Sequence, residues 1–179
     1  MKKLFLIAAL AVASLSASAQ FYSGGALGFT RNATDNITTF TLAPEVGYTF
    51  NEDWSFGGVL DYEYRYTRGS KLNIFEISPY ARYNYAALAE DKLKFFVDAG
   101  IGFGVQKATG YDTGFVYHIG FRPGISYSLS EHYSIVAHLG NLGWEGATDK
   151  AAGEYGRKNK FTWNVFDWND LMFGFYYSF

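Results

Sequence analysis

Hydrophobic side chains alternate with small or charged ones along most of this chain, and this two-residue period constrains the fold more than any other feature. In the stretch 54–66, even-numbered positions carry Trp54, Leu60 and three tyrosines, whereas odd-numbered positions include Asp61 and Arg65. Successive side chains of a β-strand point to opposite faces, so one face here is aromatic and the other small or charged. The alternation recurs at 93–106 and 115–127. We therefore predict an all-β fold.

Five further stretches show the alternation less regularly, which gives eight predicted strands in all. They are 21–30, 37–50, 54–66, 72–85, 93–106, 115–127, 133–143 and 161–179. Pro44 and Pro79 lie inside two of these stretches. Because proline has no N–H to donate to a ladder, we expect β-bulges at both positions.

Short polar turns recur along the chain at a nearly constant interval. They begin at Asn51, Glu90 and Ser130, which are 39 and 40 residues apart, and each precedes a large hydrophobic residue. The connections on the opposite side fall near 31–36, 67–71, 107–113 and 144–160. Three turns and four loops predict an up-and-down antiparallel barrel of eight strands. Short periplasmic turns, longer outer loops and an even strand number are typical of outer-membrane barrels, so both termini of the chain would lie in the periplasm.

The first residues have the three-part pattern of a secretory signal peptide. Lys2 and Lys3 precede an apolar run over 4–12, and Ala-Ser-Ala at 17–19 forms a small-residue cleavage site. The run is too short for a spanning helix, which needs about 20 apolar residues. We expect a signal peptide over 1–19, cleaved after Ala19, and a single barrel domain over 20–179.

The aromatic content favours a transmembrane barrel over a soluble barrel or a β-sandwich. The chain is 20% aromatic, with 15 Tyr and 17 Phe. An eight-stranded barrel has little room for so many rings inside, so the aromatic faces are expected to point outward into lipid. Aromatic residues gather near strand ends, as in the girdles at membrane interfaces. These residues are Tyr48, Phe50, Trp54, Tyr62, Tyr64, Tyr66, Tyr83 and Tyr85.

Charged and titratable residues of mixed sign lie on the predicted inner face. Six of them are at similar distances from the turns: Glu45, Asp61, Arg82, Asp98, Arg122 and His138. Three more, Glu63, Arg65 and Glu76, lie further from the turns on the same face. Unpaired charges in a narrow lumen cost several kcal/mol or more, so these groups are expected to pair. Our hypothesis is a network of interior salt bridges that plugs the barrel. The alternative is that the same residues line a narrow, water-filled channel.

The end of the chain is an alternating aromatic tail. Its members are Phe173, Phe175, Tyr177 and Phe179. This tail resembles the C-terminal signature that the assembly machinery reads in outer-membrane proteins. With the signal peptide and the eight strands, the chain resembles the small barrels typified by outer-membrane protein A, in its membrane domain, and outer-membrane protein X. The resemblance implies a monomer in the bacterial outer membrane, in contact with membrane lipid, lipopolysaccharide and the barrel assembly machinery.

Little in the sequence points to catalysis or to a cofactor. There are no cysteines and the formal net charge is −2, which gives no sign of a thiolate metal site or of nucleic-acid binding. Gly100, Gly102 and Gly104 have strand spacing and are interpreted as small inward residues rather than as a phosphate loop. We expect no catalytic residues, no metal and no cofactor, and a structural or surface-interaction role. The alternatives are a small pore or transporter, and a lipid-modifying enzyme that would need a serine paired with a histidine such as His118.

Overall fold

The computed structural model describes residues 20–34, 36–67, 69–148, 157–164 and 172–179. The predicted signal peptide over 1–19 lies outside these residues, as do parts of the last predicted loop and of the last predicted strand. Within the described residues the secondary structure is β-strand and turn. No helix in this part of the chain is long and apolar enough to cross a membrane.

Ten strand segments form one antiparallel sheet. They are β1 (Gln20–Asn32), β2 (Ile37–Thr49), β3 (Trp54–Thr67), β4 (Ser70–Leu88), β5 (Leu93–Ala108), β6 (Gly114–Ser128), β7 (Tyr133–His138), β8 (Asn141–Ala147), β9 (Lys160–Asn164) and β10 (Met172–Ser178). The observed bounds agree with the predicted strands to within a few residues. The fourth strand runs three residues further at its C-terminal end, and β8 extends pairing to Ala147, inside the loop predicted to begin near 144.

The sheet closes on itself into an eight-stranded barrel. Consecutive strands pair from β1 to β6, and β10 closes the barrel by pairing with β1. β6 pairs with both β7 and β8, while β10 pairs with β7 and β9 pairs with β8. β7 and β8 therefore make up the seventh barrel strand, and β9 and β10 the eighth. The predicted antiparallel up-and-down architecture is confirmed.

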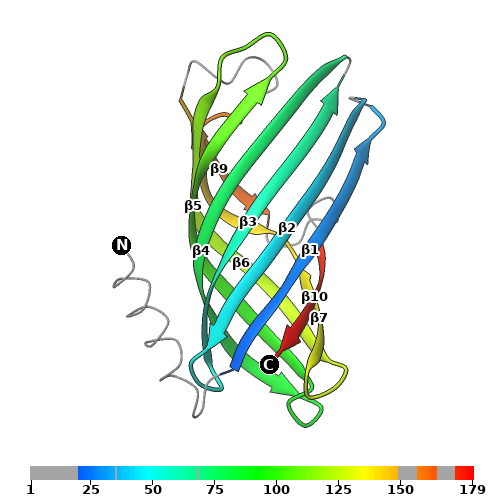
Figure 1. Ribbon diagram of the computed structural model, residues 1–179, viewed down its shortest axis with the longest axis vertical. Coiled ribbons are helices and arrows are strands. Elements are labelled where there is room, and N and C mark those ends of the chain that lie inside the picture. Colours follow the sequence, from blue (N-terminus) through cyan, green and yellow to red (C-terminus); the bar gives the residue numbers. More distant parts are fainter. Residues whose placement is uncertain (1–19, 35, 68, 149–156, 165–171) are drawn as a thin grey trace, which may run out of the picture.

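The two ends of the barrel differ. Tight turns connect β2 to β3, β4 to β5 and β6 to β7 at one end, where the C-terminus and the start of β1 also lie (Figure 1). We call this the turn end. The opposite end, here the loop end, carries the connections that follow β1, β3, β5 and β8. The strands are tilted strongly relative to the long axis, as closure of a barrel requires (Figure 1).

The bulges expected at Pro44 and Pro79 are not present. Pro44 stays in register with Gly25, and Pro79 stays in register with Gly58. Each proline interrupts the ladder on one side only. At Pro44 the interrupted ladder is the one with β3, and at Pro79 it is the one with β5. Beyond each interruption the pairing continues in the same register. A residue in an antiparallel ladder directs its N–H and C=O to the same neighbouring strand, so each proline weakens one ladder without displacing it. The register shift recorded in β4 lies instead between Asn84 and Ala86.

A third proline lies where the seventh strand is interrupted. Phe121 pairs with Leu142 and Gly124 pairs with His138, so the register moves by one residue between β8 and β7. The Leu139 N–H donates to the Pro123 carbonyl at 3.0 Å. Pro123 has no N–H with which to return a bond, which explains why the strand breaks opposite it.

The alternating pattern places hydrophobic side chains on the outer surface of the barrel. Exposed side chains occur on every long strand and on β10, and they include Phe29, Leu42, Phe56, Ile77, Phe103, Phe121 and Phe175. Inward positions are instead small, polar or charged over most of the barrel. A buried apolar cluster lies inside near the loop end and consists of Leu72, Ile74, Ala108, Val116 and Ala147.

Candidate functional site: the lumen of the barrel

Four aromatic rings fill the lumen toward the turn end, each lying over a glycine on the adjacent strand. The cross-strand pairs are Tyr22–Gly47, Tyr80–Gly57, Phe96–Gly124 and Tyr176–Gly24. A Cβ atom added at any of these glycines would overlap the ring opposite. A glycine in a strand interior allows a neighbouring group to approach closely, so each one provides the space that its ring occupies.

Glu45 is the acceptor at the centre of these rings. The Tyr176 hydroxyl donates to Glu45 Oε2 at 2.6 Å, and the Tyr80 hydroxyl donates to Glu45 Oε1. Tyr22 is hydrogen-bonded in turn to the Tyr80 hydroxyl. Glu45 is only 3% exposed. A buried carboxylate is stable only when hydrogen bonds or opposite charges replace its lost hydration, and the two tyrosines supply such bonds.

Arg82 joins this acceptor to a second one, Asp98. The Arg82 guanidinium donates to both Asp98 oxygens, at 2.7 and 3.0 Å, and approaches Glu45 Oε1 at 3.5 Å. It also lies over the Phe96 ring, 3.9 Å from the ring centroid. Arg82 and Asp98 are both buried, at 6% and 2% exposed. Bidentate hydrogen bonds and a cation–π contact therefore hold the guanidinium in one orientation.

Arg122 and His138 complete this arrangement beside Asp98. Arg122 Nη2 lies 3.5 Å from Asp98 Oδ2, and the Arg122 side chain is 28% exposed. His138 Nδ1 lies 3.8 Å from the same oxygen, too far for a hydrogen bond, and has no hydrogen-bond partner among the described residues. We call the nine residues the lumen layer: Tyr22, Glu45, Tyr80, Arg82, Phe96, Asp98, Arg122, His138 and Tyr176.

A second charged group lies closer to the loop end. Glu76 accepts hydrogen bonds from His118 and, at 2.6 Å, from Arg157, while Arg157 also approaches Glu145 at 3.4 Å. Lys160 lies 2.8 Å from Glu145. Burial alone would lower the pKa of Arg157, which lies outside the strands, but Glu76 and Glu145 raise it above its usual value. We call these five residues the outer cluster.

The remaining predicted lumen charges lie apart from both groups. Arg65 Nη2 lies 2.7 Å from Glu63 Oε1, but without the angles of a hydrogen bond, so this buried oxygen has no hydrogen-bond donor in the described part of the chain. Asp61 faces the lumen without a hydrogen bond or an ion pair to any described residue. Of the nine predicted charges, Glu45, Arg82, Asp98, Arg122 and His138 come together. Asp61 does not join them.

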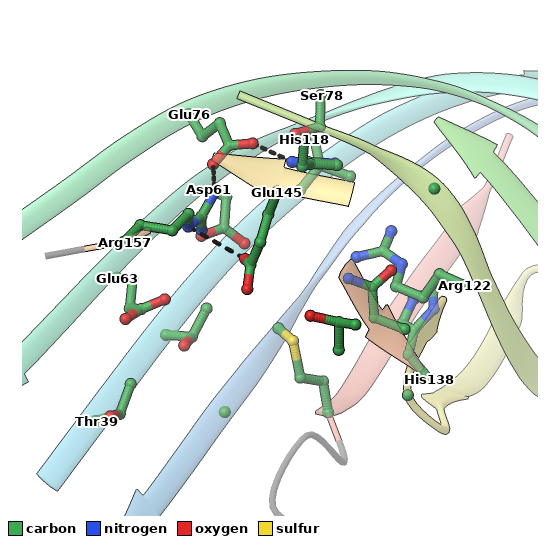
Figure 2. Close-up of a pocket in the computed structure, with 18 of the residues that line it drawn as sticks. Thr39, Asp61, Glu63, Glu76, Ser78, His118, Arg122, His138, Glu145 and Arg157 are labelled. Carbon is green, nitrogen blue, oxygen red and sulfur yellow. Dashed lines mark hydrogen bonds and ion pairs between the residues drawn. The ribbon is translucent and has the colours of Figure 1, made fainter. Parts of the chain in front are cut away.

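A polar cavity of about 830 Å³ occupies the lumen beyond the lumen layer. Its floor includes Tyr80, Asp98 and His138, and its lining extends to Asn32, at the loop end of β1. The outer cluster forms one side of the cavity, where dashed lines join Glu76, His118, Arg157 and Glu145 (Figure 2). Glu63 and Thr39 lie on the opposite side from Arg122 and His138 (Figure 2).

The predicted C-terminal aromatic residues are on the outside of the barrel. Phe173, Phe175 and Phe179 are exposed, and the half-buried Tyr177 stacks on the His132 ring with centroids 5.7 Å apart. The Phe179 N–H donates to the Phe21 carbonyl at 2.9 Å, which fixes the last residue beside the first strand.

The site contains little that favours metal or nucleophilic chemistry. No group of three or more His, Cys, Asp or Glu residues in the described part of the chain could hold a metal ion. His118 is hydrogen-bonded to Glu76, and no serine hydroxyl is hydrogen-bonded to it among the residues that the structure describes. The arrangement can hold charges in place and can receive a polar solute in its cavity.

Similar proteins were found among solved structures only. No protein-family model matches the sequence, and no curated protein matches it. The structure is similar to that of Ail, a Yersinia pestis outer-membrane protein. The two share 14% sequence identity over 90% of this chain and 98% of Ail, with a TM-score of 0.42. A de novo designed transmembrane β-barrel shares 13% identity over 90% of this chain and 95% of the design, with a TM-score of 0.32.

Sequence reasoning missed two parts of the site. The first is the set of four rings, whose signal is an inward aromatic residue directly opposite a glycine. That signal becomes visible only once the strand register is known. The second is Arg157, which lies in a predicted loop and reaches into the lumen to Glu76. No strand periodicity covers such a residue, so the pattern of inward positions could not include it.

Proposed function

We propose that this chain is an integral protein of the bacterial outer membrane, with a lumen closed by the lumen layer. Its role is structural or involves surface interaction, without catalysis. The observation that carries the proposal is the buried Arg82, held by Asp98, Glu45 and Phe96 across the lumen. We infer that this layer closes the continuous water path that a pore would need.

The outer surface supports the membrane part of the proposal. Large hydrophobic side chains are exposed around the barrel, for example Leu27 at 58%, Ile119 at 57% and Phe173 at 59%. A soluble monomer rarely exposes contiguous apolar patches larger than a few hundred Å². In a bilayer the same surface is favourable, and closure pairs the backbone groups that lipid cannot solvate. Membrane lipid and lipopolysaccharide are then the immediate surroundings of the barrel.

We infer that assembly uses the C-terminal tail. Phe173, Phe175 and Phe179 are exposed on the last strand, where they are accessible to the barrel assembly machinery. The chain would reach this machinery after export and removal of residues 1–19. As a monomer the barrel needs no partner subunit for closure, because β1 pairs with β10 of the same chain.

Cell fractionation tests the location and the membrane insertion together. The full chain is expressed in a Gram-negative host, and its membranes are separated by density. The expected result is protein in the outer-membrane fraction that migrates faster on a gel before boiling than after it. Protein that accumulates in the periplasm in soluble form would contradict the proposal.

A further inference from the structure

The cavity beyond the lumen layer contains two opposite charges that are incompletely paired. Asp61 has no ion pair or hydrogen bond with any described residue, and it lines the cavity from β3. Arg122 lines the cavity from β6, with more than a quarter of its side chain exposed. Its contact with Asp98, at 3.5 Å, is longer than the bonds that Asp98 already accepts from Arg82.

The same cavity offers further unsatisfied polar atoms near both charges. On the side of Asp61, the buried Glu63 Oε1 lies 2.7 Å from Arg65 Nη2 but has no hydrogen-bond donor among the described residues. His138 is 2% exposed, lines the cavity beside Arg122, and its Nδ1 has no hydrogen-bond partner among the described residues. Buried polar groups are normally satisfied, and neither atom has a hydrogen-bond partner among the described residues, so a ligand in the cavity can supply one.

Most of the other charges that line the cavity are already engaged within the chain, and the exception among the described residues is Lys158. Glu76 is bonded to His118 and Arg157, and Glu145 is paired with Lys160. Hydroxyl groups of Thr30, Thr39 and Thr41 also line the cavity. The groups that remain available to a ligand are therefore the Asp61 carboxylate, the cations Arg122 and Lys158, and hydroxyl groups that can donate or accept hydrogen bonds.

We propose that this cavity binds a small zwitterion that carries a primary ammonium group and a carboxylate, as an amino acid does. The ammonium group pairs with Asp61 and Glu63, and the carboxylate pairs with Arg122. The volume of about 830 Å³ lies within the range of small-molecule sites. The lining extends to the loop end but stops at the lumen layer, so the solute enters from the outside and does not pass through.

Titration of the refolded chain in detergent micelles tests the proposal. The probes are glycine, 4-aminobutanoate and 6-aminohexanoate, which separate the two charges by increasing lengths. Butylamine and butanoate carry one charge each and serve as ligand controls. At least one zwitterion is expected to give saturable heat and to bind about tenfold or more tightly than either single-charge probe. Equal binding of butylamine would overturn the role of Arg122, and no binding by any probe would overturn the site.

Asp61→Asn removes the charge but keeps the shape of the side chain, and it is expected to weaken binding about tenfold or more. Asp53→Asn changes an exposed carboxylate in a turn and should leave binding unchanged. Unchanged binding by Asp61→Asn would overturn the assignment. If that variant does not fold, the wild-type chain still decides the question by NMR. The amide signals of Asp61 and Glu63 should shift with the zwitterion, and a shift confined to Lys71 or Lys107 would contradict the proposal.

Discussion

Asp98 lies directly between Arg82 and Arg122 in the sheet, paired in register with Arg82 on β4 and with Arg122 on β6. Only Arg82 forms close bonds with it, at 2.7 and 3.0 Å. Both guanidinium groups belong to the lumen layer, but Asp98 holds Arg82 closely whereas Arg122 faces the cavity. The proposed closure of the lumen and the proposed solute site both rest on this unequal sharing of one carboxylate.

Replacing Arg82 with Met should destabilise the barrel strongly. The substitution keeps an apolar chain of similar length but leaves Asp98 and Glu45 buried without their guanidinium partner. Removing one member of a buried ion pair typically costs about 3–5 kcal/mol. Urea unfolding of the chain in lipid vesicles measures this loss. Arg31→Met, which removes an exposed guanidinium hydrogen-bonded to Thr38, should cost about 0.5 kcal/mol or less. Equal effects of the two variants would contradict the role of Arg82.

Tyr176→Phe should show what the tyrosine hydroxyls contribute. The change removes one donor from Glu45 Oε2, whose hydrogen bond with Tyr176 is 2.6 Å long, and keeps the ring over Gly24. A buried acceptor that loses its partner costs about 1–3 kcal/mol in the free energy of unfolding. The matched variant is Tyr62→Phe, which removes an exposed hydroxyl bonded to Asn73 and should change stability by about 0.5 kcal/mol or less. A neutral Tyr176→Phe would mean that Glu45 does not depend on this donor.

Gly102→Ala should separate Glu76 from His118. A Cβ atom at this position would overlap both side chains, which meet over the glycine. Overpacking of this kind typically costs about 1–3 kcal/mol. The measurement combines urea unfolding with the NMR signals of the His118 ring, which should move when the contact is lost. Gly58→Ala is the control because nothing lies within 4 Å of the added atom. An unchanged His118 spectrum in Gly102→Ala would count against the contact.

Phe179→Ala should separate assembly in cells from folding in vitro. The ring is 68% exposed, and the backbone bond from Phe179 to Phe21 does not need it. Stability after refolding is therefore expected to stay within about 0.5 kcal/mol of wild type. If the assembly machinery reads the tail, the amount of protein in the outer membrane should fall severalfold. Leu129→Ala, at another exposed apolar residue of the turn end, should leave that amount unchanged. Equal amounts for both variants would exclude a signal at Phe179.

The period-two pattern was sufficient to predict the barrel and the direction of its side chains. Leu60 and Phe75 point outward, and Glu45 and Asp98 point inward, as alternation requires. The position of an inward residue along the barrel axis was harder to predict. Counting from the turns placed Asp61 level with Arg82, but Arg82 pairs with Ser55. Trp54, the first residue of β3, pairs with Tyr83 of β4. β4 continues past Tyr83 to Leu88, so the ends of the two adjacent strands are staggered at the turn end.

Stagger and register also explain why the four aromatic rings of the lumen layer were not predicted. Tyr22 and Gly47 are 25 positions apart in sequence, and only the pairing of β1 with β2 brings them together. The same holds for Arg157, whose partners Glu76 and Glu145 lie on β4 and β8. A one-dimensional pattern tells which face a residue occupies, whereas partners across the lumen depend on the register of every ladder between them.

Single-channel recording in planar bilayers tests the closed lumen most directly. The chain is refolded, its change in gel mobility on boiling is checked, and insertion into the bilayer is verified before recording. We expect the wild-type barrel to be electrically silent, because Arg82, Glu45, Asp98 and the surrounding rings fill its cross-section. Steady openings whose conductance rises with salt concentration would mean that the lumen layer lines a water path, and they would contradict the closed barrel.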